Sequence, residues 1–144
     1  MDSIKLIAKE FDKTIEQRNL QKVLDFFSKE CEIELLGITL KGKEGAKLWI
    51  TWLFENAPNL RFEPVVIISD GDVFYEEFYV NITLPNGKII RSHQAETLVF
   101  ENNLLKSLRI FFNPLDFSDI VAKDPLSKFV INYIKKKSRK GLEK

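Results

Sequence analysis

The sequence has very few of the residues that build disulfides and metal centres. Cys31 is the only cysteine and His93 the only histidine among 144 residues. A disulfide within the chain needs two cysteines, and structural zinc sites use several cysteine or histidine ligands. Intramolecular disulfides, zinc clusters and multi-histidine centres are therefore excluded. Cys31 falls in an apolar strand pattern, where a cysteine is expected to act as a small buried hydrophobic residue and not as a nucleophile.

Long hydrophobic runs and a large net charge are also missing. No stretch approaches the roughly 20 apolar residues of a membrane-spanning helix, and the first residues do not resemble a signal peptide. We therefore expect a cytoplasmic protein with no membrane partner. The formal net charge is +1, which does not favour a nucleic-acid partner. Positive charge is concentrated in residues 135–144, which contain six basic residues and one acidic residue, Glu143.

The periodicity of the apolar residues predicts one α+β domain. Helical spacing and strand alternation follow one another along the chain, with helices first and long strands later. Helices are expected over residues 4–15, 20–27, 42–57 and 125–134, and strands over 32–35, 38–40, 61–68, 73–84, 88–101 and 104–113. Tight turns join the last four strands, which predicts an antiparallel meander.

Two of the expected helices have clear start signals. Gly42 and Gly45 lack the Gly-Lys-Ser/Thr ending of a phosphate-binding loop, so we expect them to open a helix that buries both Trp49 and Trp52. Asp124 and Pro125 can cap the last helix. Its apolar stripe must cover the pocket mouth, the outer face of the sheet or a second subunit, and we favour packing in a dimer.

Four stretches of the sequence, in this order and spacing, resemble the SnoaL-like branch of the nuclear transport factor 2-like superfamily. They are residues 19–27, 40–46, 60–63, and 96–101 running on to 107–114. The resemblance covers roughly residues 4–117 and is more specific for fold than for activity. It implies a SnoaL-like domain over residues 1–122, followed by an amphipathic helix and basic tail over residues 123–144.

The resemblance also implies a particular architecture. A strongly bent antiparallel sheet forms a cone around the N-terminal helices, and the open end of the cone is a mostly apolar pocket. Members often dimerise through the outer face of the sheet. The superfamily includes isomerases, cyclases, dehydratases, hydrolases and non-catalytic proteins, so the fold alone sets no chemistry.

Ketosteroid isomerase is the sharpest catalytic template within this superfamily. It uses an aspartate base and an oxyanion site formed by a tyrosine and a protonated aspartate. By this resemblance the base position falls at Leu35 and the tyrosine position at Phe11, and neither side chain can replace the group. The protonated acid falls at Glu96. The ketosteroid isomerase mechanism is therefore disfavoured, and a scytalone dehydratase mechanism would be expected to need more than one histidine.

Glu96 is the candidate catalytic residue, since SnoaL-like polyketide cyclases move protons with an acid in the pocket. Strand alternation places it with Gln94, Leu98 and Phe100, on the side opposite His93. Burial would raise the pKa of such a carboxyl group and suit it to proton transfer. A salt bridge or exposure at the pocket mouth remains the alternative.

Glu76 is the second acid in an apolar strand pattern. It either pairs with Glu96 across the pocket, supplying an acid and a base, or meets solvent where the strand leaves the core. Other residues expected to line the pocket are apolar, and the same residues can instead form a filled core. The lining set is Phe11, Leu35, Trp49, Glu76, Phe78, Leu98, Leu108, Ile110 and Phe112.

Two functions remain open at this point. The first is a protein that binds a small hydrophobic molecule, or transforms it as a cofactor-independent isomerase, cyclase or hydrolase that uses Glu96, with no metal. The second is a non-catalytic homodimer that acts as a protein-interaction module with a filled pocket. A third hypothesis, contact of the basic tail with RNA or a membrane, is disfavoured because the tail is short and lacks interleaved aromatic residues.

Overall fold

The computed structural model of the chain describes residues 2–143. These residues form two compact units, which divide between Phe112 and Asn113. The first unit contains a sheet and three helices, and the second contains the C-terminal helices.

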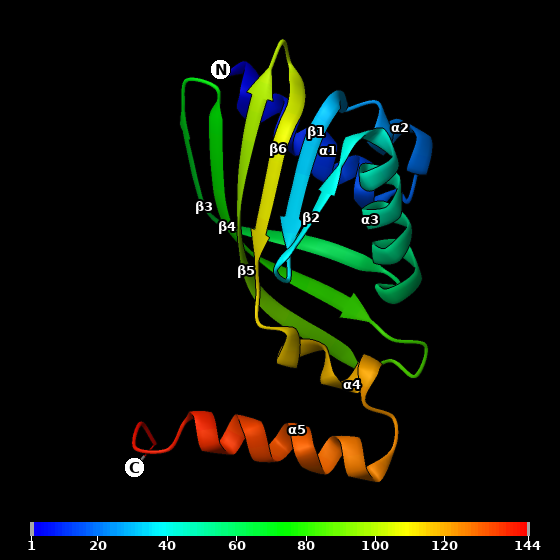
Figure 1. Cartoon of the computed structure of the whole chain (residues 1–144), viewed down its shortest axis with the longest axis vertical. Helices are drawn as coiled ribbons and strands as arrows, with labels where there is room; N and C mark the ends of the chain where they lie inside the picture. Colours follow the sequence, from blue (N-terminus) through cyan, green and yellow to red (C-terminus); the bar gives the residue numbers. More distant parts are fainter. Residues whose placement is uncertain (1, 144) are drawn as a thin grey trace. The chain divides into compact units, whose positions relative to one another are not determined.

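The first unit confirms the α+β class, with helices near its start and a long run of strands after them (Figure 1). Its elements are α1 (Ser3–Glu16), α2 (Leu20–Leu24), β1 (Phe27–Leu35), β2 (Ile38–Lys41), α3 (Gly42–Asn56), β3 (Leu60–Asp70), β4 (Val73–Thr83), β5 (Ile89–Glu101) and β6 (Leu104–Phe111).

The six strands form one sheet in the order β2-β1-β6-β5-β4-β3. The predicted meander of β3 to β6 is confirmed, but the sheet is mixed, because β1 and β6 run parallel. The chain leaves the β1–β2 hairpin through α3 and re-enters the sheet at the opposite edge. The meander then ends with β6 beside β1, in the same direction.

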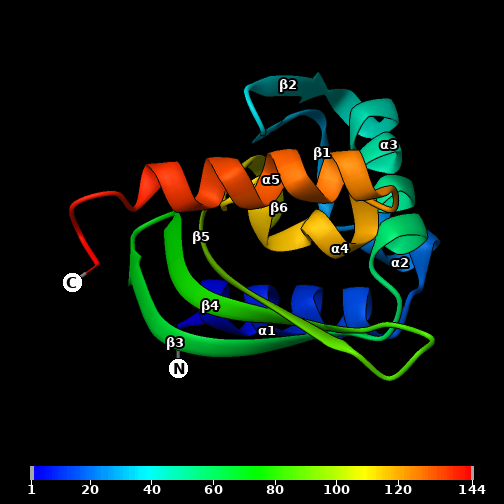
Figure 2. The same ribbon diagram turned by 90° about the horizontal axis from the view of Figure 1, so that it is seen from below.

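Helix α1 packs against β3 and β4, which curve around it (Figure 2). Asp2 caps the helix by accepting a hydrogen bond from the backbone N–H of Ile4 at 3.0 Å. Its buried face carries Ile4, Ala8, Phe11 and Ile15 at helical spacing.

An aromatic cluster fills the space between α1 and α3. The Phe11 ring centre lies 5.4 Å from that of Phe26, 5.7 Å from that of Phe27 and 6.5 Å from that of Trp49. The expectation that α3 buries both tryptophans is wrong, because Trp52 is 40% exposed whereas Trp49 is 4% exposed. Ala46, Trp49 and Ile50 form the buried arc of α3, and Trp52 lies outside it.

The second unit consists of η1 (Pro114–Phe117), α4 (Ser118–Val121) and α5 (Pro125–Ser138). The predicted start of α5 is confirmed, since Asp124 Oδ1 accepts a hydrogen bond from the backbone N–H of Ser127 at 2.8 Å. Within residues 2–143, no helix is both long enough and apolar enough to cross a bilayer.

Gly45 provides a test of how closely α3 approaches the end of β2. A Cβ at residue 45 would lie 2.9 Å from the carbonyl carbon of Leu40 and 3.1 Å from its Cβ. We expect Gly45→Ala to lower the free energy of unfolding by about 2 kcal/mol, because backbone must shift to relieve the contact. Lys47→Ala, on the exposed face of α3, is the control and should change stability little. Equal stability of both variants in chemical denaturation would contradict the close approach.

Candidate functional site

Three carboxyl groups from three elements meet in the first unit. Asp12 comes from α1, Glu76 from β4 and Glu96 from β5, and one carboxylate oxygen of each lies within 4.8 Å of the others. Glu76 is 2% exposed and Glu96 is 5% exposed, whereas Asp12 is half-buried. We refer to Asp12, Glu76 and Glu96 as the carboxyl cluster.

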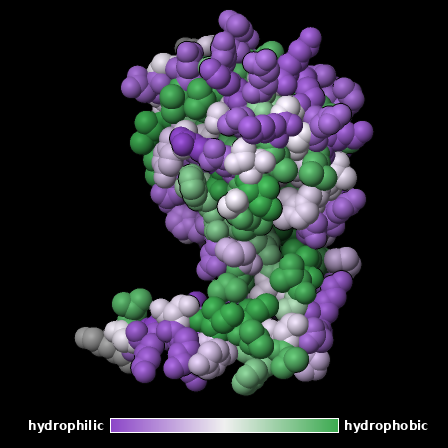
Figure 3. All heavy atoms as spheres, viewed as in Figure 1, coloured by the Kyte–Doolittle hydropathy of each residue, from purple (hydrophilic) through white to green (hydrophobic). Residues whose placement is uncertain are grey.

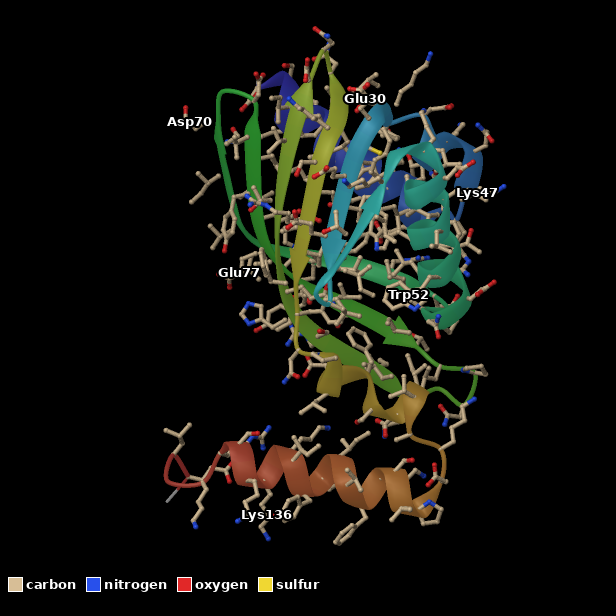
Figure 4. The ribbon with its side chains drawn as sticks, viewed as in Figure 1. Glu30, Lys47, Trp52, Asp70, Glu77 and Lys136 are labelled. Atoms are coloured by element: carbon tan, nitrogen blue, oxygen red, sulfur yellow. The ribbon has the colours of Figure 1, made fainter. Side chains whose placement is uncertain are left out.

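Strand pairing places two members of the carboxyl cluster side by side. Glu76 of β4 is directly opposite Glu96 of β5 in the antiparallel register. Burial alternates along both strands, which confirms the predicted side for Glu96 and shows that Glu76 shares it. Glu77, the next residue along β4, lies on the outer face (Figure 4).

Two of the alternatives left open by the sequence are therefore wrong. Glu76 does not meet solvent, because it is almost fully buried. Glu96 makes no salt bridge, since within residues 2–143 no lysine, arginine or histidine forms an ion pair with any member of the carboxyl cluster.

Sequence reasoning missed Asp12. Its signal lay in the spacing of α1, because Asp12 follows the buried Ala8 by four residues and precedes the buried Ile15 by three. Those offsets place all three residues on one side of a helix. An aspartate at such a position is an acid on the buried face, as Glu76 and Glu96 are on their strands.

Apolar side chains surround the two glutamates on the same face of the sheet. Across β4, β5 and β6, the row with Glu76 and Glu96 continues to Ile110. Phe74, Leu98 and Leu108 form the next row towards one strand end, and Phe78 pairs with Gln94 on the other side. Gln94 is uncharged and donates a hydrogen bond to Ser92 Oγ at 3.2 Å.

This environment raises the pKa of all three acids. Burial raises the pKa of Glu76 from its ordinary value of 4.5 to about 7. Burial also raises the pKa of Glu96 well above its usual range, and the neighbouring Asp12 and Glu76 carboxylates raise it further. The pKa of Asp12 rises for the same reasons, burial first and then the charge of Glu76.

Hydrogen bonding between their side chains shifts the pKa values of Glu76 and Glu96 in opposite directions. It raises the pKa of Glu96 and lowers that of Glu76, as expected when protonated Glu96 donates to the Glu76 carboxylate. At an effective dielectric constant of about 20, two ionised carboxylates 4.8 Å apart repel each other by about 3.5 kcal/mol. The carboxyl cluster therefore retains protons near neutral pH, and Glu76 is the member poised to exchange one.

The same oxygens are of the kind that a hard cation such as Mg²⁺ or Ca²⁺ prefers. Binding such a cation would require the cluster to release the protons that its burial favours. The carboxyl cluster thus has two chemical options, proton exchange and cation ligation, and its apolar surroundings favour the first.

The residues expected to line a pocket are all in the first unit. Phe11 and Trp49 belong to the aromatic cluster, and Phe78 packs on Phe62 with ring centres 5.8 Å apart. Most of the set is buried, while Ile110 and Phe112 are half-buried. A cavity of about 390 Å³ lies elsewhere, in the second unit beside Tyr133 and Lys136.

His93 lies on the outer face, as predicted. Its Nε2 atom is 2.7 Å from Glu77 Oε2, and its ring stacks on Tyr79 with centres 4.5 Å apart. Arg91 covers Tyr79 at 3.6 Å from the ring centre and lies 3.0 Å from Glu63 Oε2. Cys31 is buried, and its burial raises the pKa of the thiol, so no reactive thiolate is present.

The arrangement of helices, curved sheet and buried acids can be compared with known families. The family model of the SnoaL-like domain matches residues 8–107. The chain belongs to the SnoaL-like family. The match spans α1 to the middle of β6, so it includes every member of the carboxyl cluster.

Solved structures share the fold of this SnoaL-like chain at low sequence identity. An NTF2-like protein of unknown function from Burkholderia pseudomallei is 17% identical, covers 85% of this chain and 99% of its own, and gives a TM-score of 0.74. A SnoaL-like protein from Shewanella putrefaciens, proposed to be a polyketide cyclase, is 12% identical over 86% of this chain and 88% of its own, with a TM-score of 0.73.

A third similar structure is SalBIII, an epoxide hydrolase/cyclase-like enzyme with a role in pyran ring formation in the polyether salinomycin. It is 15% identical, covers 78% of this chain and 92% of its own, and gives a TM-score of 0.69. No curated protein matches the sequence significantly. At these identities the similarity establishes the fold, and the chemistry must be argued from the carboxyl cluster itself.

The raised pKa of Glu76 predicts that stability falls as the pH rises. Below pH 4.5 this group is protonated in both the folded and the unfolded chain, and above that value the unfolded chain ionises first. The free energy of unfolding therefore decreases between pH 4.5 and about 7, and ionisation of Glu76 accounts for roughly 3 kcal/mol of this decrease. Glu76→Gln should remove this part of the loss, measured as the free energy of unfolding by denaturant titration across that range.

Glu10→Gln is the matched control, because Glu10 is an exposed acid on α1, the helix that carries Asp12. It should leave the slope of stability against pH close to that of the unmodified chain. A stability that rises with pH over the same range, or an equal slope in Glu76→Gln, would contradict the raised pKa.

Proposed function

We propose that this chain is a cytoplasmic, cofactor-independent protein that binds a small hydrophobic molecule and moves a proton on it with the carboxyl cluster. The observation that carries the proposal is the meeting of three acids among apolar side chains with no cation paired to them in residues 2–143. Burial of ionisable groups costs stability, and such groups with shifted pKa values concentrate at functional sites.

Each member of the carboxyl cluster has a distinct proposed role. Glu96, whose pKa is raised by burial and by both neighbours, remains protonated and serves as the proton donor. Glu76, with a pKa of about 7, is the base near neutral pH. Asp12 lies on the helix side of the site, where its charge raises the pKa of Glu96 and so favours the protonated donor.

Abstraction of a proton at one atom of the ligand and donation at another is an isomerisation, and the same pair can promote ring closure or water addition. Leu35 and Phe11 are buried apolar residues, so the base and the tyrosine of the ketosteroid isomerase arrangement have no counterpart there. The proposed site instead takes its base from β4. SalBIII, described as epoxide hydrolase/cyclase-like, supports ring chemistry on this fold as one option.

A second candidate function rests on a different observation. The outer face of the sheet exposes apolar residues of neighbouring strands, with Val66 at 39%, Ile68 at 56% and Tyr75 at 37% exposure. Figure 3 shows hydrophobic side chains exposed where β3 lies. Such a patch favours a homodimer, in which the chain can act as an interaction module whose interior is filled by its own side chains.

Proton abstraction is testable with nitrobenzisoxazole, an apolar probe that opens to a coloured nitrophenolate when a base removes its carbon-bound proton. We expect the chain to accelerate this reaction, with a rate that rises through about pH 7 as Glu76 ionises. Glu76→Gln should lower the rate by about 100-fold, a typical contribution of a positioned base.

Glu77→Gln is the control, because Glu77 is not a member of the carboxyl cluster and lies on the opposite face of the same strand. It should keep both the rate and its pH profile. If the unmodified chain gave no acceleration over a carboxylate buffer, or if Glu76→Gln were as fast, the acid/base proposal would fail and the interaction module would be favoured.

A homodimer formed through the outer face of the sheet can be tested separately. Ile68→Lys places a charge within the exposed patch of the outer face, so it should shift the chain from dimer to monomer in light scattering coupled to gel filtration. Leu48→Lys, at a 61% exposed position on α3, is the control and should remain dimeric. A monomeric unmodified chain at all concentrations would exclude this dimer.

A further inference from the structure

Helix α5 has its apolar stripe on an exposed side. None of its residues is buried, and its half-buried positions, Ser127, Ile131 and Lys135, follow one another at four-residue steps. Lys135 Nζ donates a hydrogen bond to Ser118 Oγ at 3.1 Å within the second unit. The apolar stripe lies on other sides of the helix: Leu126 (72% exposed), Phe129 (68%), Val130 (45%), Tyr133 (54%) and Ile134 (42%).

Basic side chains continue this stripe along the helix. At 3.6 residues per turn, Lys136 and Lys137 lie within about 20° of the angular sector occupied by Phe129, Tyr133 and Leu126, and Lys140 follows two residues after the end of the helix. Lys137 Nζ lies 5.8 Å from the Tyr133 ring centre. Lys136 projects from the last turns of α5 (Figure 4). One side of α5 thus presents apolar residues near its start and positive charge near its end.

A hollow lies at the basic end of this side. The cavity of about 390 Å³ is lined by Tyr133, Lys136, Lys137 and Lys140 among others. A negatively charged group of headgroup size placed there would lie beside four basic side chains and one aromatic ring, against a single acidic residue, Glu143. The apolar stripe leads directly to this hollow, because Tyr133 belongs to both.

We propose that α5 binds the surface of an anionic lipid bilayer. The helix is about 21 Å long, so it is suited to lie in the interface and not to cross it. Its apolar side chains would enter the boundary of the acyl chains, while the lysines extend to the lipid phosphates. Residues 113–144 carry net positive charge, which complements an anionic surface.

Two other occupants fit this side of α5 less well. A stable protein interface buries about 800 Å² per partner, and a strip of five side chains on one helix is smaller than that. RNA offers phosphates to the lysines but no apolar layer for Leu126, Val130 and Ile134. The sequence favoured dimer packing for this helix and no membrane partner, and the exposed stripe with its basic continuation is the reason to depart from both expectations.

The test is flotation of the full chain with vesicles of phosphatidylcholine alone and of phosphatidylcholine mixed with phosphatidylglycerol. We expect binding to the mixed vesicles that weakens as salt is added. Each lysine near an anionic surface strengthens binding about fivefold, so the double variant Lys136→Gln/Lys140→Gln should weaken binding about 25-fold. Phe129→Ser should weaken it by about tenfold through loss of apolar burial.

Lys9→Gln/Lys47→Gln is the matched control, because it removes two exposed lysines of the first unit and the same total charge. It should bind the mixed vesicles as the unmodified chain does. Equal binding to both kinds of vesicle, no binding to either, or equal losses in the two double variants would overturn the proposal. So would a dimer that Phe129→Ser dissociates in the absence of vesicle binding, since a second copy would then be the occupant.

Discussion

The antiparallel register of β4 and β5 places Glu76 directly opposite Glu96, and this pairing is the constraint on which the site depends. Neither side chain can turn to solvent without breaking the alternation that buries Phe74, Phe78 and Leu98 on the same face. Helix α1 lies over these strands and adds Asp12 to the pair. These three elements bring the acids together, and burial then favours their protonated forms.

Such an arrangement works against stability. A folded domain tolerates buried acids when enough apolar burial surrounds them, and here the aromatic cluster of Phe11, Phe26, Phe27 and Trp49 occupies the adjoining core. Phe11 of this aromatic cluster and Asp12 of the carboxyl cluster are consecutive residues of α1. Helix α1 therefore contributes one residue to the apolar core and the next residue to the carboxyl cluster.

The SnoaL-like fold has the same architecture in proteins whose chemistry differs, and this chain shows why. Many positions on the inner face of the sheet point towards the same volume, so an acid can enter it from several strands. Here the acids come from α1, β4 and β5, while Leu35 and Phe11 are apolar. The exposed apolar residues of the outer sheet face and of α5 are different residues from those of the carboxyl cluster.

The sequence by itself determined the family, the α+β class, the helix cap at Asp124 and the inner side for Glu96, because these follow from local spacing and short motifs. Tertiary structure decided the rest. Whether Glu76 was buried depended on what covers β4, and Asp12 joined the site only because α1 lies over that strand. The parallel β1–β6 pair and the exposure of Trp52 likewise depend on contacts between distant segments, and no local pattern encodes those contacts.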